Sequence, residues 1–108
     1  MVDLSKVKGI YLYPDTVNFK KGIPSLTNLI LTSYKESEIK NCIFIFFSRN
    51  KNQIKMIEIN DDGIWLYEKR LNNASFILPS VDGNVKIDKR QLIEILNIVS
   101  PKKIRNNA

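Results

Sequence analysis

The 108-residue sequence contains no histidine and a single cysteine, Cys42. Without histidine the chain has no imidazole for acid–base catalysis or for a histidine metal site, and a lone cysteine without histidine makes a thiol protease implausible. Cys42 has no internal disulfide partner and lies in the apolar run CIFIFF, so we expect a buried thiol in a reducing compartment. A glycine-rich phosphate loop is missing as well, and no cofactor is expected.

Long apolar runs and segments rich in glycine or proline are also missing. The chain has four glycines and four prolines, and none of its apolar stretches approaches the roughly 18 residues that indicate a membrane-spanning helix. It does not open with a basic and then apolar leader, so we expect a cytoplasmic protein without membrane contact. The length suits one domain, which we place at residues 1–100, followed by a basic and frayed tail at 101–108.

The charge is unbalanced in favour of cations. Lysine and arginine number 17 against 11 acidic residues, which gives a net charge of +6. A surplus of this size attracts polyanions, of which nucleic acid is the commonest in a cell, and it also keeps a small protein in solution. Composition alone leaves both interpretations open.

The pattern of apolar residues predicts an α+β fold. Segments rich in β-formers, joined by short connections, are expected to form an antiparallel β-meander of about four to five strands, with two helices packed on one face. The segment CIFIFFS is apolar at nearly every position, so we expect it at the centre of the sheet and buried on both faces. The expected strands are 7–13, 42–48, 53–59, 64–71 and 74–78, the last four pairing consecutively, and the expected helices are 25–35 and 89–99.

The two expected helices carry their own boundary signals. Pro24 suits the first turn of the first helix. Asp88 and Gln91 have the spacing of a capping box at the start of the second helix, and Pro101 stops it. Apolar residues recur at helical spacing in both segments and are expected to cover the central strand. The expected core therefore includes Leu29, Phe44, Phe46, Leu92 and Leu96.

The stretch GIWLYEKRL at 63–71 raises a question of function. In an extended chain Trp65 and Tyr67 share one face with Lys69, whereas Arg70 falls on the other face. An exposed aromatic face with basic residues would suit nucleic acid, but tryptophan and tyrosine more often pack against a core or a sheet face. Because Lys69 and Arg70 point to opposite faces, a nucleic-acid footprint has to draw on several segments.

Three acidic residues, Glu58, Asp61 and Asp62, are the one enzyme-like feature. They lie close together in the sequence and would in principle hold Mg²⁺ for phosphoryl transfer. Asp61 and Asp62 also belong to NDDG, and aspartate is favoured in turns for local backbone reasons. The turn is the stronger interpretation. No catalytic or metal site is therefore expected, and a small metal-dependent nuclease is the weaker alternative.

Residues 46–79 carry a series of short motifs at characteristic spacings. These are Ile-Lys at 54–55, Gly-x-Trp-Leu at 63–66, Lys-Arg-Leu at 69–71 and Phe-x-x-Pro at 76–79. The series resembles the small TnpB-like accessory protein, encoded by the second open reading frame, of the insertion-sequence-66 family of transposable elements. The motifs from 63 to 79 are the most specific part of this resemblance.

The resemblance extends over nearly the whole chain. Lys20, Lys21 and Gly22 stand at the family's Arg-Lys-Gly positions, and the segment KIDKRQLIEIL resembles its closing helix. The turn after the central strand is less basic than the family pattern, because uncharged residues occupy three of its positions: Asn50, Asn52 and Gln53.

The resemblance implies a non-catalytic accessory role in transposition beside a separate transposase. With the positive net charge, it makes weak phosphate-directed DNA binding or transposome assembly the leading hypothesis. A module that docks on the transposase or on other proteins of the element without touching DNA is the alternative from another class, and the oligomeric state stays open. The candidate DNA-contacting cations are Lys20, Lys21, Arg49, Lys51, Lys55, Lys69 and Arg70.

Overall fold

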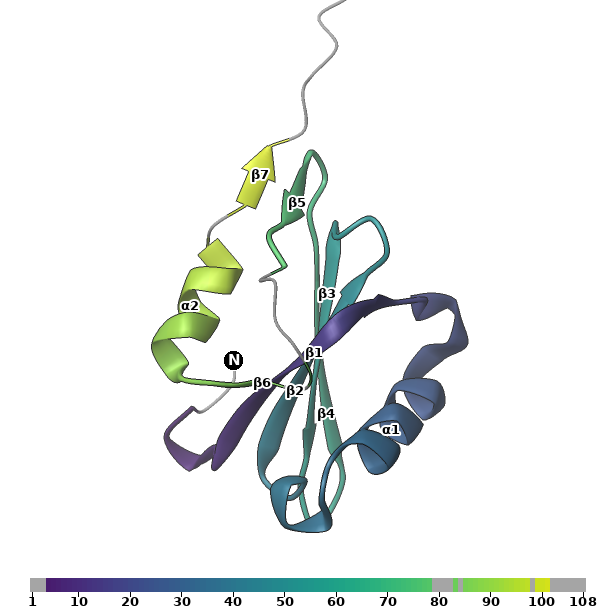
Figure 1. Cartoon of the computed structure of the whole chain (residues 1–108), viewed down its shortest axis with the longest axis vertical. Helices are drawn as coiled ribbons and strands as arrows, with labels where there is room; N and C mark the ends of the chain where they lie inside the picture. The colour runs from purple at the N-terminus through teal and green to yellow at the C-terminus, as the bar shows by residue number, and fades with distance from the viewer. Residues whose placement is uncertain (1–3, 79–82, 84, 98, 102–108) are drawn as a thin grey trace, which may run out of the picture.

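A computed structural model describes residues 4–78, 83, 85–97 and 99–101, apart from the side chains of Lys21 and of 99–101. Its centre is a twisted five-stranded sheet with one helix on each side (Figure 1). The elements in chain order are η1 (Leu4–Lys6), β1 (Gly9–Val17), η2 (Phe19–Lys21), α1 (Gly22–Ser33), η3 (Glu36–Glu38), β2 (Cys42–Ser48), β3 (Gln53–Ile59), β4 (Ile64–Arg70), β5 (Ala74–Phe76), β6 (Val85–Ile87), α2 (Lys89–Asn97) and β7 (Val99–Pro101).

The five-stranded sheet has the order β4-β3-β2-β1-β6. β2, β3 and β4 form the predicted antiparallel meander, in which Ile57 of β3 lies between Phe44 and Leu66 of its two neighbours. β1 runs parallel to β2, because the connection between them is a long crossover that contains α1. β6 pairs with β1 in the antiparallel sense. The α+β class is confirmed, and the sheet is mixed with one parallel pair.

The prediction that both helices pack on one face is wrong. α1 covers one side of the sheet and α2 covers the other, as Figure 1 shows. We call these the α1 side and the α2 side. The reason lies in β2, where every residue is buried: Phe44 and Phe46 face the α1 side, whereas Ile45 between them faces the α2 side. A strand that is apolar on both faces requires cover on both faces.

The prediction that the fifth strand pairs with β4 is also wrong. Ala74–Phe76 forms a small second sheet with Val99–Pro101. The Phe76 amide donates to the Lys51 carbonyl over 2.6 Å, which holds β5 beside the β2–β3 turn. The ring of Phe76 is 1 % exposed and meets Phe47 edge-on, with 6.1 Å between the ring centroids. Burial of this phenylalanine on the α2 side therefore decides where β5 lies, rather than a tight hairpin.

Several element boundaries differ from the prediction. β1 continues past Pro14, with an irregularity in its pairing with β2 between Leu12 and Thr16. Proline is tolerated at such irregularities, because the ladder hydrogen bond is already interrupted there. α1 begins at Gly22, which leaves Pro24 in its first turn as expected, and α2 ends at Asn97. The chain beyond α2 returns as a strand, β7, instead of extending the helix.

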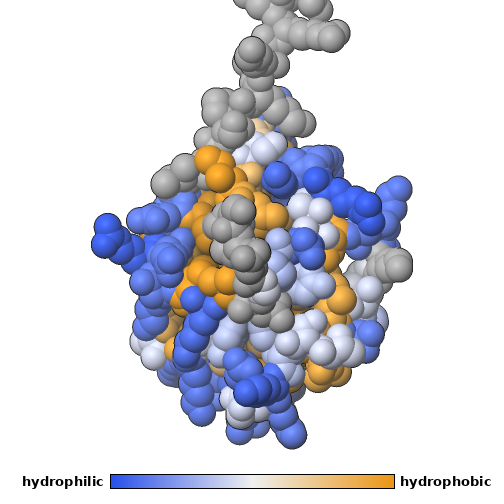
Figure 2. All heavy atoms as spheres, in the orientation of Figure 1, coloured by the Kyte–Doolittle hydropathy of each residue, from blue (hydrophilic) through white to orange (hydrophobic). Residues whose placement is uncertain are grey.

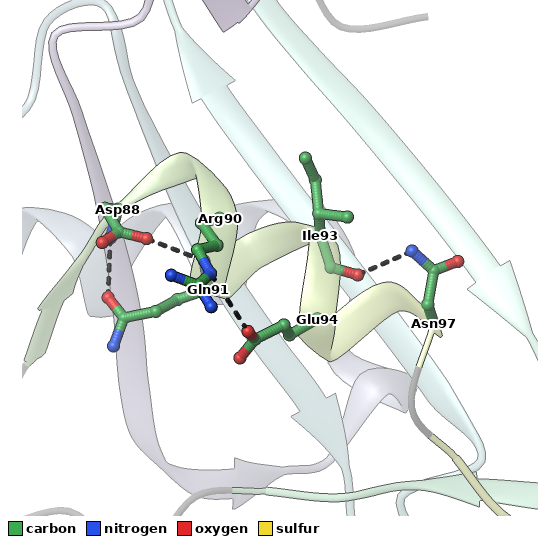
Figure 3. Close-up of polar contacts among 6 residues, drawn as sticks. All are labelled: Asp88, Arg90, Gln91, Ile93, Glu94 and Asn97. Atoms are coloured by element: carbon green, nitrogen blue, oxygen red, sulfur yellow. Dashed lines mark hydrogen bonds and ion pairs between the residues drawn. The ribbon is translucent and has the colours of Figure 1, made fainter.

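The start of α2 is fixed by the predicted capping box (Figure 3). The Gln91 amide donates to Asp88 Oδ1 over 2.7 Å, and the Asp88 amide donates to Gln91 Oε1 over 2.8 Å. Near the other end the Asn97 side-chain amide donates to the Ile93 carbonyl over 2.8 Å. The two bonds of the capping box satisfy backbone amides that a helix leaves unpaired at its start, so they stabilise a helix of only nine residues.

The core prediction is confirmed for Phe44, Phe46 and Leu92, each 1 % exposed or less. Leu29 and Leu96 are only half-buried, because each lies at the flank of its helix. In Figure 2 hydrophilic atoms cover the outer surface of α2, and hydrophobic atoms show beside it toward the sheet. The helical residues that are most deeply buried are Leu26, Ile30, Leu92 and Ile95.

The ends of the chain bear on two further expectations. Residues 102–108, most of the expected basic tail, lie outside the described residues. Across the part of the chain that the structure describes, neither α1 nor α2 is long and apolar enough to cross a membrane.

Candidate functional site

Exposed cations from three segments meet at one end of the sheet, the upper end in Figure 1. β1 and β2 finish side by side there, with Val17 in register with Ser48. β4 finishes opposite the start of β3, with Arg70 in register with Gln53. The loops at this end are therefore neighbours. We call this region the basic end, and its described members are Lys20, Arg49, Lys51, Lys69 and Arg70.

The β2–β3 turn at the basic end is held by uncharged side chains. The Ser48 hydroxyl donates to Asn50 Oδ1 over 3.0 Å and accepts from the Gln53 amide over 3.1 Å. Lys51 has a left-handed φ of 61°, and its amide donates to the Ser48 carbonyl over 2.9 Å. The side chains of Asn50 and Asn52, two of the departures from the more basic family pattern, both accept from the Ser48 hydroxyl and thus help to fix the turn that presents Arg49 and Lys51 to solvent.

The loop that carries Lys20 is fixed by a cap of the same kind. Asn18 Oδ1 accepts from the Lys20 amide over 2.9 Å and caps the short helix η2. Gly22 follows with φ of 74°, a left-handed value that favours glycine. The Lys20 side chain is exposed, whereas that of Lys21 lies outside what the structure describes.

Lys55 is turned inward. It is 8 % exposed, and its Nζ lies 3.2 Å from Glu68 Oε1 and 4.8 Å from the centroid of the Phe19 ring. The carboxylate and the ring face satisfy the ammonium group within the fold. The geometry gives Lys55 a role in tying η2 to the sheet and does not present it to a phosphate.

Lys69 and Arg70 lie on opposite sides of the sheet, as their alternation predicts. Lys69 is in register with Ile54 on the α2 side, and Arg70 is in register with Gln53 on the α1 side. Both are exposed. Among the described residues none of the five members of the basic end has an ion-pair partner, so their charges are available to an anion.

Trp65 and Tyr67 lie in the first part of β4, next to acidic side chains. Their rings stack with 6.3 Å between centroids and 22° between planes, and Trp65 is 60 % exposed. The pair lines a groove of about 800 Å³, which we call the acidic groove because Glu58, Asp61 and Asp62 also line it. Burial, reinforced by the Glu58 carboxylate, raises the pKa of Tyr67. The three carboxylates would repel phosphates from this groove. Of the candidate cations on β4, Lys69 lies on the same side of the sheet as the aromatic pair and lines a neighbouring cavity with Tyr67.

The carboxylates of the acidic groove do not converge on a metal position. Within the described residues, no group of three or more acidic, cysteine or histidine side chains is arranged to hold a metal ion. Asp61 is engaged by Lys40, with 2.8 Å between Nζ and Oδ1. The NDDG segment forms the predicted turn, in which the Asn60 amide donates to the Gly63 carbonyl over 2.8 Å. The geometry therefore gives no support to the nuclease hypothesis.

Cys42 is a core residue. It is 4 % exposed, and burial raises the pKa of its thiol, although Lys86 and Lys8 act in the opposite direction. A buried thiol with a raised pKa has little thiolate at neutral pH and is unreactive. Cys42 therefore belongs to β2 and to the core cluster on the α1 side.

A second group of cations, missed by the sequence analysis, surrounds a cavity of about 490 Å³ at the β6 edge. It comes from three segments that are distant in sequence, namely the chain before β1, strand β6 and the start of α2. Asp88 lies among these cations and offsets part of their charge. In the sequence, the segment KIDKR at 86–90 contains three of these cations. The fourth, Lys8, is brought beside them only by the pairing of β1 with β6. The cations are Lys8, Lys86, Lys89 and Arg90.

Comparison with known proteins gives two matches. An uncharacterized protein, y4hO, of Sinorhizobium fredii (strain NBRC 101917 / NGR234) is 26 % identical over 89 residues, which cover 82 % of this chain and 77 % of that protein. No solved structure matches the chain. The sequence model of a family described as IS66 Orf2-like matches residues 8–106, a span that includes the basic end and the acidic groove. The chain therefore belongs to the IS66 Orf2-like family, whose members are associated with transposition.

Proposed function

We propose that this protein is a non-catalytic accessory of transposition that binds DNA phosphates through the basic end. Family membership supports the link to transposition. The observation that carries the DNA contact is the gathering of five exposed cations, without ion-pair partners among the described residues, at one end of the sheet. Lysine and arginine bind phosphate oxygens regardless of base sequence. Such a protein acts where the element's DNA lies, in the cytoplasm.

The binding should be weak and largely independent of sequence. The cations stand in the short helix η2, in a turn and at a strand end, and among the described residues neither α1 nor α2 carries any member of the basic end toward base edges in the major groove. This arrangement suits a protein that helps to assemble a complex of DNA and transposase more than one that selects the element ends by itself.

A titration of duplex DNA across salt concentrations tests the proposal. If about five phosphates are neutralised, log K should fall with log salt at a slope near −4 to −5. Replacing Arg49 and Lys51 together with alanine should reduce the magnitude of this slope by roughly 2. The matched control is Lys35→Ala, an exposed lysine beyond the C-terminal end of α1, which should leave the slope unchanged.

Two outcomes would count against the DNA contact. One is the absence of binding at low salt, which together with a stable complex with the transposase of the same element would favour the protein-interaction module. The other is a slope that the Arg49 and Lys51 replacements do not change. That result would move the contact to the second group of cations, and Lys86→Ala with Lys89→Ala would then reduce the slope instead.

A further inference from the structure

β4 is an edge strand whose first half is apolar and exposed. Among the described residues it pairs with β3 alone, so one side of its backbone has no partner strand. Ile64 is 46 % exposed and Trp65 is 60 % exposed, and the two side chains point to opposite sides of the sheet. Long edge strands with exposed apolar residues readily accept a further strand, and folded proteins usually protect them.

The other edge of the sheet, β6, is protected. It has three residues, Val85–Ile87, and its central residue is the exposed Lys86. A short strand and a lysine are two common ways to block edge pairing. β4 has seven residues, and its charged residues stand only in its second half. The contrast between the two edges is that β6 is protected against pairing with a further strand and the first half of β4 is not.

We propose that β4 pairs with β4 of a second copy of this chain, antiparallel about a two-fold axis at Leu66. In this register Leu66 lies opposite its own counterpart, and Trp65 of each copy lies opposite Tyr67 of the other. The two stacked aromatic pairs then form one cluster of four rings on the α2 side. Pairing removes Trp65 and Ile64 from water, which a single copy leaves exposed.

The charges along the strand select both the partner and the register. Asp62 lies in the turn before β4, and Lys69 and Arg70 end the strand. Antiparallel pairing about Leu66 brings Asp62 of each copy to Arg70 of the other, so the contact forms twice and leaves the other four members of the basic end available to DNA. Parallel pairing would instead place the two arginines side by side, which is unfavourable. Asp62 has no ion-pair partner among the described residues, so its charge is available for this contact.

A second copy fits this edge better than an unrelated cationic peptide does. Such a peptide would satisfy the carboxylate of Asp62 but would leave Arg70 without an acidic partner. In antiparallel pairing, a strand complements both halves of β4 only if it also begins with an acidic residue, continues with aromatic residues and ends with basic residues. β4 is its own complement in this sense.

Sedimentation velocity over a concentration series tests the pairing. We expect a monomer–dimer equilibrium for the unmodified chain. Asp62→Arg and Arg70→Asp should each raise the dissociation constant by about tenfold or more, because each puts like charges opposite one another twice. Both positions are exposed, so each variant should keep the circular dichroism spectrum of the unmodified chain.

A mixture of the two variants is the matched control. In a dimer of one Asp62→Arg copy and one Arg70→Asp copy, both contacts again join opposite charges. The dimer should therefore reappear in the mixture, although neither variant forms it well alone. A dimer that tolerates both single variants, or a mixture that stays monomeric, would overturn the proposed contact.

Disulfide cross-linking tests the register. Residues directly opposite in an antiparallel pair have Cβ atoms about 4.5–5.5 Å apart, close enough for a disulfide after small adjustment. Leu66→Cys should therefore give a covalent dimer on mild oxidation, whereas Ile64→Cys should not, because residue 64 faces residue 68 of the other copy. The native Cys42 is buried and should not interfere. A chain that stays monomeric at every concentration, or equal cross-linking by both variants, would refute the pairing.

Discussion

β2 and β4 have the same length and belong to the same sheet, yet they lie at opposite extremes of burial. All seven residues of β2 are buried. In β4 two residues are half-buried and the other five are exposed. β3 separates the two strands, so the change from core to surface takes place within two strand spacings. The difference comes from cover: α1 and α2 enclose β2 from both sides, whereas Ile64 and Trp65 of β4 pack against neither core cluster.

The comparison teaches that the same kind of residue serves two purposes in this sheet. The phenylalanines and isoleucines of β2 are explained by the fold of one copy, because each meets a helix or a neighbouring strand. Ile64 and Trp65 are not explained in this way, since a single copy leaves them largely exposed. The proposed pairing of β4 with a second copy would cover both of these side chains.

The largest expected effect comes from a direct test of this contrast. Phe44→Ala should lower the free energy of unfolding by about 3–5 kcal/mol, because it leaves a cavity between β2 and α1. Ile64→Ala, measured at a protein concentration where the chain is monomeric, should lower it by about 0.5 kcal/mol or less. Urea denaturation gives both values. Similar losses of stability for the two variants would contradict the difference between a buried β2 and an exposed β4.

A smaller loss of stability is expected from substitutions in α2, and it tests which residues of this helix cover β2. Leu92→Ala should lower the free energy of unfolding by about 2–5 kcal/mol, since Leu92 is 1 % exposed. Leu96→Ala, at the half-buried flank of the same helix, should lower it by about 1–2 kcal/mol. Thermal or urea unfolding would show the difference. Equal losses would mean that α2 presents a broader face to the sheet than its burial indicates.

The capping box gives the next effect in size. Asp88→Ala removes the side-chain acceptor of the Gln91 amide and should lower the free energy of unfolding by about 1 kcal/mol. Lys89→Ala, one residue further along on the exposed surface of α2, should change it by about 0.5 kcal/mol or less. If both variants unfold at the same urea concentration, the cap does not hold α2 over β2.

The smallest effect concerns Tyr34, which packs edge-on against Phe44 with 4.7 Å between ring centroids. Its hydroxyl is buried without a hydrogen-bond partner among the described residues, and burial raises its pKa well above the usual value. The folded chain thus holds this proton more tightly than the unfolded chain does, so stability falls as the pH rises above about 10, where an unfolded tyrosine ionises.

Tyr34→Phe removes that dependence together with the unpaired hydroxyl. At pH 7 its free energy of unfolding should equal that of the unmodified chain or exceed it by about 1 kcal/mol. Above pH of about 10 it should lose stability less steeply, although Tyr11 and Tyr67, whose pKa values are also raised, keep part of the slope. Urea unfolding across alkaline pH would check this, and identical slopes for both proteins would contradict the assignment to Tyr34.

Local sequence signals predicted the local features of this fold. Alternation and turn residues identified β2, β3 and β4 with small boundary errors, and the spacing of Asp88 and Gln91 identified the cap of α2. The CIFIFFS segment even indicated burial on both faces. It did not show that the helices divide between those faces, because their sides depend on the parallel pairing of β1 with β2 and on the antiparallel entry of β6.

The candidate site shows the same limit. Residue type identified Arg49, Lys51 and Arg70 as cations, but their shared location at the basic end depends on strand register. The inward orientation of Lys55 could not be predicted from the sequence for the same reason, since its partners Glu68 and Phe19 come from a neighbouring strand and from the crossover. Contacts between distant segments set these properties, and no local pattern encodes them.

The crossover between β1 and β2 also sets an order for folding. The meander of β2, β3 and β4 closes through two short turns, whereas β1 reaches β2 only after the whole segment 18–41 has been brought round. Closing a long loop costs chain entropy that short turns avoid, and pairings that span it form slowly. We therefore expect β4 to be displayed on a partly formed meander before β1, α1 and β6 complete the sheet. A newly synthesised chain would then expose the unpaired edge of β4 before the rest of the sheet has formed. Aggregation through this edge would therefore compete with folding mainly in the period just after synthesis.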